Sequence, residues 1–344
     1  MTERQLFLFW QFNGDNTSYC NYHCPYCYGR RTRNYRHNWN NKTEEWAKAF
    51  ERLNRDIYFV FSYGEAMGSH GFYKCVDMIG EHPNWTLNIL TNLSYNPERL
   101  LNSRLAKEKR LFVITSWHPL GVPDRHKAWK QYKKHLLMLK DAEVPTQVMY
   151  LWHKPQIGWF PEYFSWLDKN DFRVNIRRKL KVRHQIIDRL LRGIFPKYFA
   201  GKFRLEDYTK TEFRLLHLFN DKKTVKYSLG LHSTYGMSCR AGKDMILVEY
   251  DGTVRLCQDW GRTCLGNVFD KNFRLNMQNT SCPTNCCGGQ CGMLHLVDRE
   301  FGELPERLLA DTFVSQVGHV KQSSPVAYPN REEILECIKI LKEK

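Results

Sequence analysis

The sequence predicts an α/β fold built on a parallel sheet. Over the first 180 residues, apolar strand-like runs alternate with amphipathic helical patterns, which is typical of repeated β-α units. The 344 residues are enough to bury a large core. There is no charged-then-apolar leader and no run of about 18 or more apolar residues. We therefore expect a cytoplasmic protein with no membrane span.

Six strands are expected, with helices in the five connections between them. The strand candidates are residues 5–12, 56–64, 86–92, 111–117, 146–152 and 173–180. Thr43 is the expected cap of a helix over 44–54. A second helix, over 126–142, should bury one face, formed by Trp129, Tyr132, Leu136 and Leu139. In sheets of this kind, ligands bind at the carboxyl ends of the strands.

The pattern changes after about residue 195. The dipeptide Asp251-Gly252 separates two strand-like runs and predicts a two-residue hairpin. Pairing around this turn carries Cys257 to the open end of the hairpin, near Cys239. A final helix should begin after Asn330 and pack through Ile334, Ile338 and Leu341.

The charge is strongly basic and uneven. Lys and Arg number 52 against 36 Asp and Glu, a net charge of +16, and residues 171–226 hold 16 basic and 6 acidic residues. Binding of an anionic partner, including nucleic acid, is one interpretation. We favour a solvated basic face that offsets bound anionic clusters, because no RNP, KH or helix-turn-helix signature is present.

Three of the twelve cysteines share the loop after the first strand. Cys20, Cys24 and Cys27 have the spacing C-x3-C-x2-C. In a reducing compartment, clustered cysteines indicate metal ligands or catalytic thiols. Three thiolates hold three irons of a 4Fe-4S cluster and leave the fourth iron open to another ligand. A zinc site completed by His23 or by a distant residue is the alternative.

This loop, with Tyr26 before its last cysteine, resembles the cluster-binding loop of the radical S-adenosylmethionine (SAM) superfamily. The resemblance implies a partial (β/α)6 TIM-like barrel. It also implies that SAM binds the open iron and is reductively cleaved to methionine and a 5'-deoxyadenosyl radical, which abstracts a substrate hydrogen. An external electron donor such as flavodoxin or ferredoxin is then required.

The same resemblance assigns SAM-binding positions at the strand ends. Glu65, in "SYGEAM", matches the carboxylate of the family's GGEP-like turn, which contacts the SAM amine. Residues 149–152 would line the adenine side. The other expected cofactor-binding residues are Tyr26, Tyr63, Gly64, Thr91, Asn92, Ser116 and His118. For Ser116 and His118, a local role in satisfying backbone groups is an equal alternative.

The late cysteines resemble the auxiliary-cluster extensions of this superfamily, the compact twitch domain more than the larger SPASM domain. Cys239, Cys257, Cys286 and Cys291 are the favoured ligands of an auxiliary 4Fe-4S cluster, with Cys282 or Cys287 as substitutes. Structural zinc is the alternative. Cys264 is a candidate ligand, catalytic hydrogen donor or core residue, whereas Cys75 and Cys337 should be core residues.

The expected organisation has four parts. They are a partial barrel over 1–195, a basic connecting segment over 196–230, a small cysteine-rich α+β extension over 231–300 and a helical tail over 301–344. The expected activity is oxidation or epimerisation of a polar, carbohydrate- or nucleotide-linked substrate. Maturation of a peptide, or modification of tRNA or another nucleic acid, is the alternative. A zinc-stapled basic nucleic-acid-binding protein is the hypothesis from another class, and bound metal discriminates between the two classes.

Overall fold

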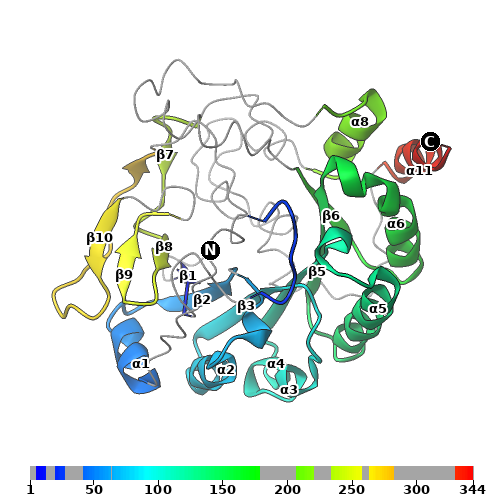
Figure 1. The fold of residues 1–344 in the computed structure, drawn as a ribbon. Coiled ribbons are helices and arrows are strands. Elements are labelled where there is room, and N and C mark those ends of the chain that lie inside the picture. Colours follow the sequence, from blue (N-terminus) through cyan, green and yellow to red (C-terminus); the bar gives the residue numbers. More distant parts are fainter. Residues whose placement is uncertain are drawn as a thin grey trace.

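The structure is a computed structural model that describes residues 5–12, 20–27, 42–62, 64–178, 207–220, 234–257, 263–282 and 330–343. Within these residues, nine strands form one sheet in the order β10-β9-β8-β1-β2-β3-β4-β5-β6. Figure 1 shows the sheet as a curved wall, with helices α1 to α6 on its outer side. The fold is therefore the expected partial barrel.

The elements of the barrel alternate as the sequence predicts. The strands are β1 (Gln5–Trp10), β2 (Asp56–Phe61), β3 (Trp85–Thr91), β4 (Leu111–Trp117), β5 (Thr146–Trp152) and β6 (Val174–Arg178). The helices between them are α1 (Thr43–Glu51), α2 (Phe72–Glu81), α3 (Glu98–Leu101), α4 (Arg104–Lys107), α5 (Arg125–Asp141) and α6 (Phe160–Lys169). Three 3-10 helices are η2 (Ala66–Gly68), η3 (Pro119–Gly121) and η4 (Lys154–Trp159). All neighbouring pairs from β1 to β6 are parallel, so the loops that follow the strands meet at one edge.

The later described elements extend this architecture. They are α8 (Lys210–Leu218), β7 (Ser238–Cys239), β8 (Met245–Val248), β9 (Thr253–Arg255), β10 (Cys264–Asn267), β11 (Thr280–Ser281) and α11 (Arg331–Lys342). The predicted hairpin is confirmed, because β8 and β9 pair antiparallel. The two-residue turn was wrong: the Glu249 amide donates to the Thr253 carbonyl, so Tyr250, Asp251 and Gly252 form a three-residue loop, with Gly252 at φ +86°. Strand β8 also pairs in parallel with β1, so the hairpin continues the barrel sheet.

An ion pair joins the amino ends of the three central strands. The Arg55 guanidinium lies 3.0 Å from the Asp244 carboxylate, just before β8, and donates to the Gln5 carbonyl at the start of β1. Both charged side chains are largely buried, at 17% and 14% exposure. The contact therefore fixes the register of β8 beside β1.

The two faces of strand β1 pack against different sets of residues. Leu6, Leu8 and Trp10 of β1 pack in the larger core with the outer helices. Phe7 and Phe9 point to the inner face, where they cluster with Tyr58 and other residues. This alternation follows from the two-residue repeat of a strand. The inner face is therefore available to a separate set of side chains.

The predicted helices are confirmed with one correction. Helix α5 buries Tyr132, Leu136 and Leu139, as its spacing predicts, whereas Trp129 of the same predicted face is only partly buried against the core. Helix α11 buries Ile334, Ile338 and Leu341. The prediction that Thr43 caps α1 was wrong: Thr43 is its first helical residue, and Lys42 occupies the cap position without a side-chain hydrogen bond. The cysteines of α2 and α11, Cys75 and Cys337, are buried core residues as expected.

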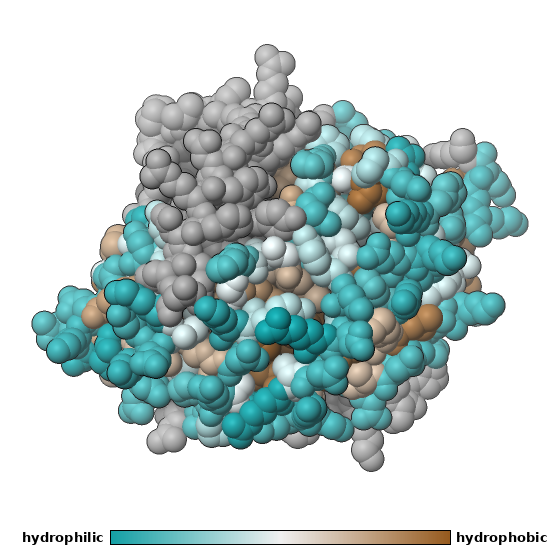
Figure 2. Space-filling view, turned by 60° about the horizontal axis from the view of Figure 1, so that its bottom comes forward, coloured by the Kyte–Doolittle hydropathy of each residue, from teal (hydrophilic) through white to brown (hydrophobic). Residues whose placement is uncertain are grey.

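The surface of the helical side is mainly polar. Figure 2 shows this side, with hydrophobic residues in small scattered groups among hydrophilic ones. Among the helices of the described ranges, none combines the length and apolar character that crossing a bilayer requires.

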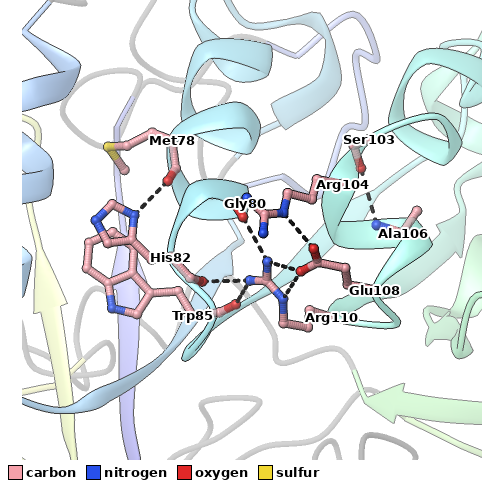
Figure 3. A network of polar contacts seen from close by, with 9 residues as sticks. All are labelled: Met78, Gly80, His82, Trp85, Ser103, Arg104, Ala106, Glu108 and Arg110. Atoms are coloured by element: carbon pink, nitrogen blue, oxygen red, sulfur yellow. Dashed lines mark hydrogen bonds and ion pairs between the residues drawn. The ribbon is translucent and has the colours of Figure 1, made fainter.

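Arg110 ties the amino ends of β3 and β4 to the end of α2 (Figure 3). Its guanidinium donates to the carbonyls of Gly80, His82 and Trp85. It also pairs with the Glu108 carboxylate at 2.6 Å, and its side chain is only 13% exposed. One side chain therefore satisfies three carbonyls where a helix ends and a strand begins.

We expect Arg110→Met to lower the free energy of unfolding by about 2–3 kcal/mol, because hydrogen bonds from a charged donor are lost at a partly buried site. Chemical denaturation measures this change. Lys109→Gln is the matched control, since Lys109 is 77% exposed and makes one surface ion pair; its effect should stay within about 0.5 kcal/mol. Equal stability of the two variants would contradict the role given to Arg110.

Candidate functional site

The three clustered cysteines lie at the carboxyl edge of the barrel. Cys24 is 7% exposed, Cys20 is partly exposed and Cys27 is exposed. The loop is anchored to the end of β4, because the His23 amide donates to the Gly121 carbonyl at 2.9 Å. The Cys27 amide donates to the Cys24 carbonyl at 3.1 Å, which closes a turn and brings the cysteines close in space.

The buried thiols need a cation in order to ionise. Burial raises the pKa of Cys20 to about 11 and that of Cys24 to about 12. Metal ligation requires the thiolate form, which an iron cluster stabilises by its positive charge. No three His, Cys, Asp or Glu side chains among the described residues converge on a single-ion site. In a 4Fe-4S cluster each of three thiolates can bind a separate iron, and Cys20, Cys24 and Cys27 are the residues that would supply these thiolates.

Gly121 gives the Cys24 thiol its space. A methyl group built on Gly121 would lie 2.5 Å from Cys24 Sγ and 3.2 Å from Tyr22 Cβ. Real Cβ atoms do not approach a sulfur atom as closely as 2.5 Å, so a larger residue at Gly121 must displace the Cys24 side chain or the loop that carries it. The glycine is required here by close approach rather than by backbone dihedral angles.

Glu65 is fully buried between the loops after β2 and β3. Its carboxylate accepts from the Thr91 hydroxyl at 2.7 Å, the Asn92 amide at 2.6 Å and the Met67 amide at 3.3 Å. Burial raises the pKa of Glu65 to about 7, although these three hydrogen bonds lower it. A neighbouring ammonium group would favour the ionised form. Gly64 precedes it at φ +62°, a conformation that favours glycine.

Asn92 connects Glu65 with the cysteine loop. Its backbone amide bonds the Glu65 carboxylate, and its side-chain nitrogen lies 3.9 Å from Cys20 Sγ. The same nitrogen donates to Asn21 Oδ1 at 3.1 Å. The predicted residues Thr91 and Asn92 are thus brought together with Glu65 and Cys20.

A hydrogen-bonded chain crosses the site from β5 to β4. The Tyr26 hydroxyl donates to Gln156 Oε1 at 3.1 Å and lies 2.8 Å from His118 Nδ1. His118 Nε2 lies 2.7 Å from Ser116 Oγ. The Cys24 thiol is a further hydrogen-bond partner of Tyr26. Tyr26, Ser116 and His118, all predicted from sequence, therefore form one unit with Gln156.

The Tyr26 hydroxyl has one proton and three polar neighbours. The Gln156 amino group donates to the Leu151 carbonyl, so the Gln156 oxygen faces Tyr26 as an acceptor. His118 Nδ1 and the Cys24 thiol are the other two neighbours, and the tautomer of His118 determines whether Tyr26 or Nδ1 donates. Burial lowers the pKa of His118 to about 4, so the ring stays neutral near pH 7. A neutral ring donates at one nitrogen and accepts at the other.

The prediction for residues 149–152 was wrong for two of the four. Tyr150 and Trp152 are buried in the outer core against Phe160 of α6. Only Met149 is placed in the inner cluster, and Leu151 shares its face by the alternation of a strand. The helix-facing positions of β5 need large apolar side chains, which explains the aromatic residues.

Three of the late cysteines belong to the same part of the core. Cys239, Cys257 and Cys282 are all buried in the inner cluster. Strands β7 and β11 pair Cys239 with Thr280, next to Cys282. Cys257 follows β9, which runs antiparallel to β8, and β8 is parallel to β1. This group therefore lies towards the amino end of β1, away from Cys20.

Several predicted residues stand apart from these groups. Cys264 is exposed on the edge strand β10, where its thiol lies 3.6 Å from the Gly266 carbonyl. Its catalytic role stays a prediction. Tyr63, Cys286, Cys287 and Cys291 lie outside the described residues, as does most of the basic segment.

Sequence reasoning missed three residues of the site. Gln156 ends the hydrogen-bonded chain, Gly121 packs on Cys24, and the His153 ring meets Tyr26 edge to face at 5.0 Å. Gly121 and His153 follow the ends of β4 and β5, where ligand-binding residues are expected. Their position was the only available signal.

Comparison with known proteins gives the family. The radical SAM superfamily model matches residues 17–154. No curated protein matches the sequence. The structure of native anSMEcpe with bound AdoMet and the Cp18Cys peptide superposes with a TM-score of 0.51 at 16% identity, over 77% of this chain and 78% of that chain.

Two further solved structures are similar at lower scores. Streptococcus suis SuiB has a TM-score of 0.49 at 14% identity, over 78% of this chain and 64% of its own. BtrN in complex with AdoMet and 2-DOIA has a TM-score of 0.39 at 14% identity, over 77% and 78%. The matched range 17–154 contains Cys20, Cys24 and Cys27 and the strand ends that surround them. Residues 17–154 are therefore identified as a radical SAM superfamily domain.

Proposed function

We propose that Cys20, Cys24 and Cys27 hold a 4Fe-4S cluster and that the chain cleaves SAM reductively to begin hydrogen abstraction from a polar substrate. The observation that carries this proposal is the packing of the cysteine loop against the ends of β3 and β4, through Asn92 and Gly121. When bound and reduced by a donor such as flavodoxin or ferredoxin, the cluster supplies the electron that splits SAM into methionine and a 5'-deoxyadenosyl radical.

Glu65 is the proposed partner of the SAM amine. Three donors hold its carboxylate in one orientation, and burial raises its pKa to about 7. An ammonium group placed beside it would replace lost hydration with an ion pair. Thr91 and Asn92 then act by positioning this carboxylate.

Ser116 is the proposed partner of a SAM ribose hydroxyl. Its hydroxyl lies 2.7 Å from His118 Nε2, and the contacts of His118 with Tyr26 and of Tyr26 with Gln156 hold the ring in place. A positioned serine hydroxyl can donate to a ligand hydroxyl or accept from it. Tyr63 and Gly64 are proposed to shape the neighbouring turn.

An auxiliary 4Fe-4S cluster is proposed at the late cysteines. The burial of Cys239, Cys257 and Cys282 in one group supports a shared site, with Cys286, Cys287 or Cys291 completing the ligand set. This grouping supports Cys282 as a ligand, whereas the sequence indicated it only as a substitute. The proposed auxiliary role is to exchange an electron with the substrate radical during oxidation or epimerisation.

The inner face of the sheet supports a polar substrate. The side-chain oxygens of Asn88, Gln147 and Asn175, on β3, β5 and β6, are buried and make no hydrogen bond with the described part of the chain. Such oxygens need donors, and the hydroxyl groups of a carbohydrate or nucleotide-linked substrate would supply them. Asn88 lies level with Phe9 in the strand register, whereas Asn175 lies level with Ser116 near the carboxyl edge.

Metal content separates the alternatives. Iron with acid-labile sulfide, at about eight irons per chain, and release of 5'-deoxyadenosine support the proposal with one auxiliary cluster. Zinc alone without SAM cleavage would favour the nucleic-acid-binding hypothesis. A peptide or tRNA substrate stays an alternative within the radical SAM class, and salt-dependent RNA binding would support the latter.

We expect the triple variant Cys20→Ala, Cys24→Ala and Cys27→Ala to lose SAM cleavage and about four irons per chain, because one cluster loses all its ligands. Anaerobic reconstitution, iron analysis and 5'-deoxyadenosine release measure both effects. Cys337→Ala, in helix α11, is the control and should keep the iron of the parent chain. Full SAM cleavage by the triple variant would refute the ligand assignment.

We expect Gly121→Ala to lose the same iron, about four per chain, without replacing any ligand. The added methyl overlaps the Cys24 thiol, so the loop must move away from cluster geometry. Gly158→Ala is the matched control, since nothing lies within 4 Å of its added methyl. Iron analysis of the two variants tests this contact, and a Gly121→Ala chain with unchanged iron would rule it out.

We expect Glu65→Gln to weaken SAM binding about tenfold or more, because the ion pair with the amine is lost. Equilibrium dialysis of the reconstituted protein measures the dissociation constant. Glu44→Gln removes a charge from an exposed position in the first turn of α1 and should leave it unchanged. Wild-type affinity in Glu65→Gln would remove Glu65 from the SAM site.

A further inference from the structure

We propose that the side-chain amide of Asn92 donates a hydrogen bond to the Cys20 thiolate and thereby raises the reduction potential of the SAM-binding cluster. The inference rests on the proposed function, because it requires a cluster held by Cys20. It gives Asn92 a task distinct from any contact with SAM: Asn92 is a positioning residue that acts on the cluster through a ligand.

The orientation of the Asn92 amide is determined by its neighbours. Its oxygen accepts from the Ser94 amide at 2.9 Å, so its amino group must face the cysteine loop. That nitrogen has two hydrogens and two acceptors within reach, Asn21 Oδ1 at 3.1 Å and Cys20 Sγ at 3.9 Å. Rotating the amide would place an oxygen against both acceptors and a donor against the Ser94 amide.

The backbone around Asn92 is held as firmly as its side chain. Its amide donates to Glu65 at 2.6 Å, and Asn92 is 6% exposed. The next residue, Leu93, has φ +52°, an unfavourable conformation for a leucine. Its carbonyl is bonded to the buried His135 ring at 2.7 Å, and its amide to the Thr91 hydroxyl. Strain that persists under such restraint is common at functional sites.

Hydrogen bonds to a cluster sulfur favour the reduced state. Reduction adds negative charge to the cluster and its thiolates, and a donor stabilises the more negative state more strongly. Donors to the cysteine sulfurs are among the factors that set the potential of iron-sulfur clusters. Cys20 has the Tyr22 backbone amide as a second donor, so Asn92 completes a pair of donors on one ligand.

The test uses Asn92→Asp and Asn92→Ser in the full reconstituted chain. Both side chains retain an oxygen for the Ser94 amide but lack the amino group that reaches Cys20. Ser94→Ala is the control, because it removes the hydroxyl bonded to Asn21 and keeps the Asn92 amide. The readout is a redox titration of the cluster whose electron paramagnetic resonance signal changes when SAM is added.

We expect the ratio of reduced to oxidised cluster at a fixed potential to fall about tenfold in Asn92→Ser, a shift of about 59 mV for one electron. It should fall further in Asn92→Asp, which adds a negative charge, and stay unchanged in Ser94→Ala. Iron content should equal that of the wild type. If Asn92→Asp fails to load iron, the neutral serine variant decides the question.

A wild-type potential in Asn92→Ser, with full iron, would overturn this inference alone. A shift in Asn92→Asp without one in Asn92→Ser would also overturn it, because charge rather than the lost hydrogen bond would be responsible. If the wild-type chain has no reducible signal that responds to SAM, the proposed function falls together with this inference.

Discussion

The parallel pairing of β1 with β2 on one side and β8 on the other governs the rest of the structure. It aligns the carboxyl end of β1 with those of β2 to β5, so the cysteine loop meets the loops that carry Glu65, Asn92 and Gly121. It also places the late cysteine hairpin beside β1. The ion pair of Arg55 with Asp244 holds this arrangement where the strands begin. The carboxyl edge is thereby left to functional side chains.

Those side chains are restrained at a cost in stability. Burying the Glu65 carboxylate is unfavourable, and its raised pKa shows that three hydrogen bonds offset the cost only in part. A bound cation would offset more of it. The same reasoning applies to Cys20 and Cys24, whose thiolates are disfavoured by burial. Burial therefore disfavours the negatively charged forms of all three side chains, and a positively charged ligand would stabilise these forms.

Local patterns were enough to predict much of this, and long-range contacts were not. The strands and α5 follow from apolar periodicity, and the cysteine loop is a continuous motif. The pairing of β8 with β1 joins segments more than 200 residues apart, and neither run encodes its partner. Gly121 and Gln156 matter only because folding brings them to Cys24 and Tyr26. Thr43 was misassigned because a capping residue type does not establish a cap conformation.

The two cysteine groups lie towards opposite ends of the strands. Strand β9 runs antiparallel to β8, so Cys257, which follows β9, lies towards the amino end of β8 and of its parallel partner β1. Cys20 lies at the other end, where its thiol is 3.9 Å from the side-chain nitrogen of Asn92, after β3. If both groups bind clusters, as we propose, they therefore form separate sites. The side-chain oxygen of Asn88, which makes no hydrogen bond within the described residues, lies level with Phe9 in the strand register. A substrate that donates a hydrogen bond to this oxygen would lie between the two sites.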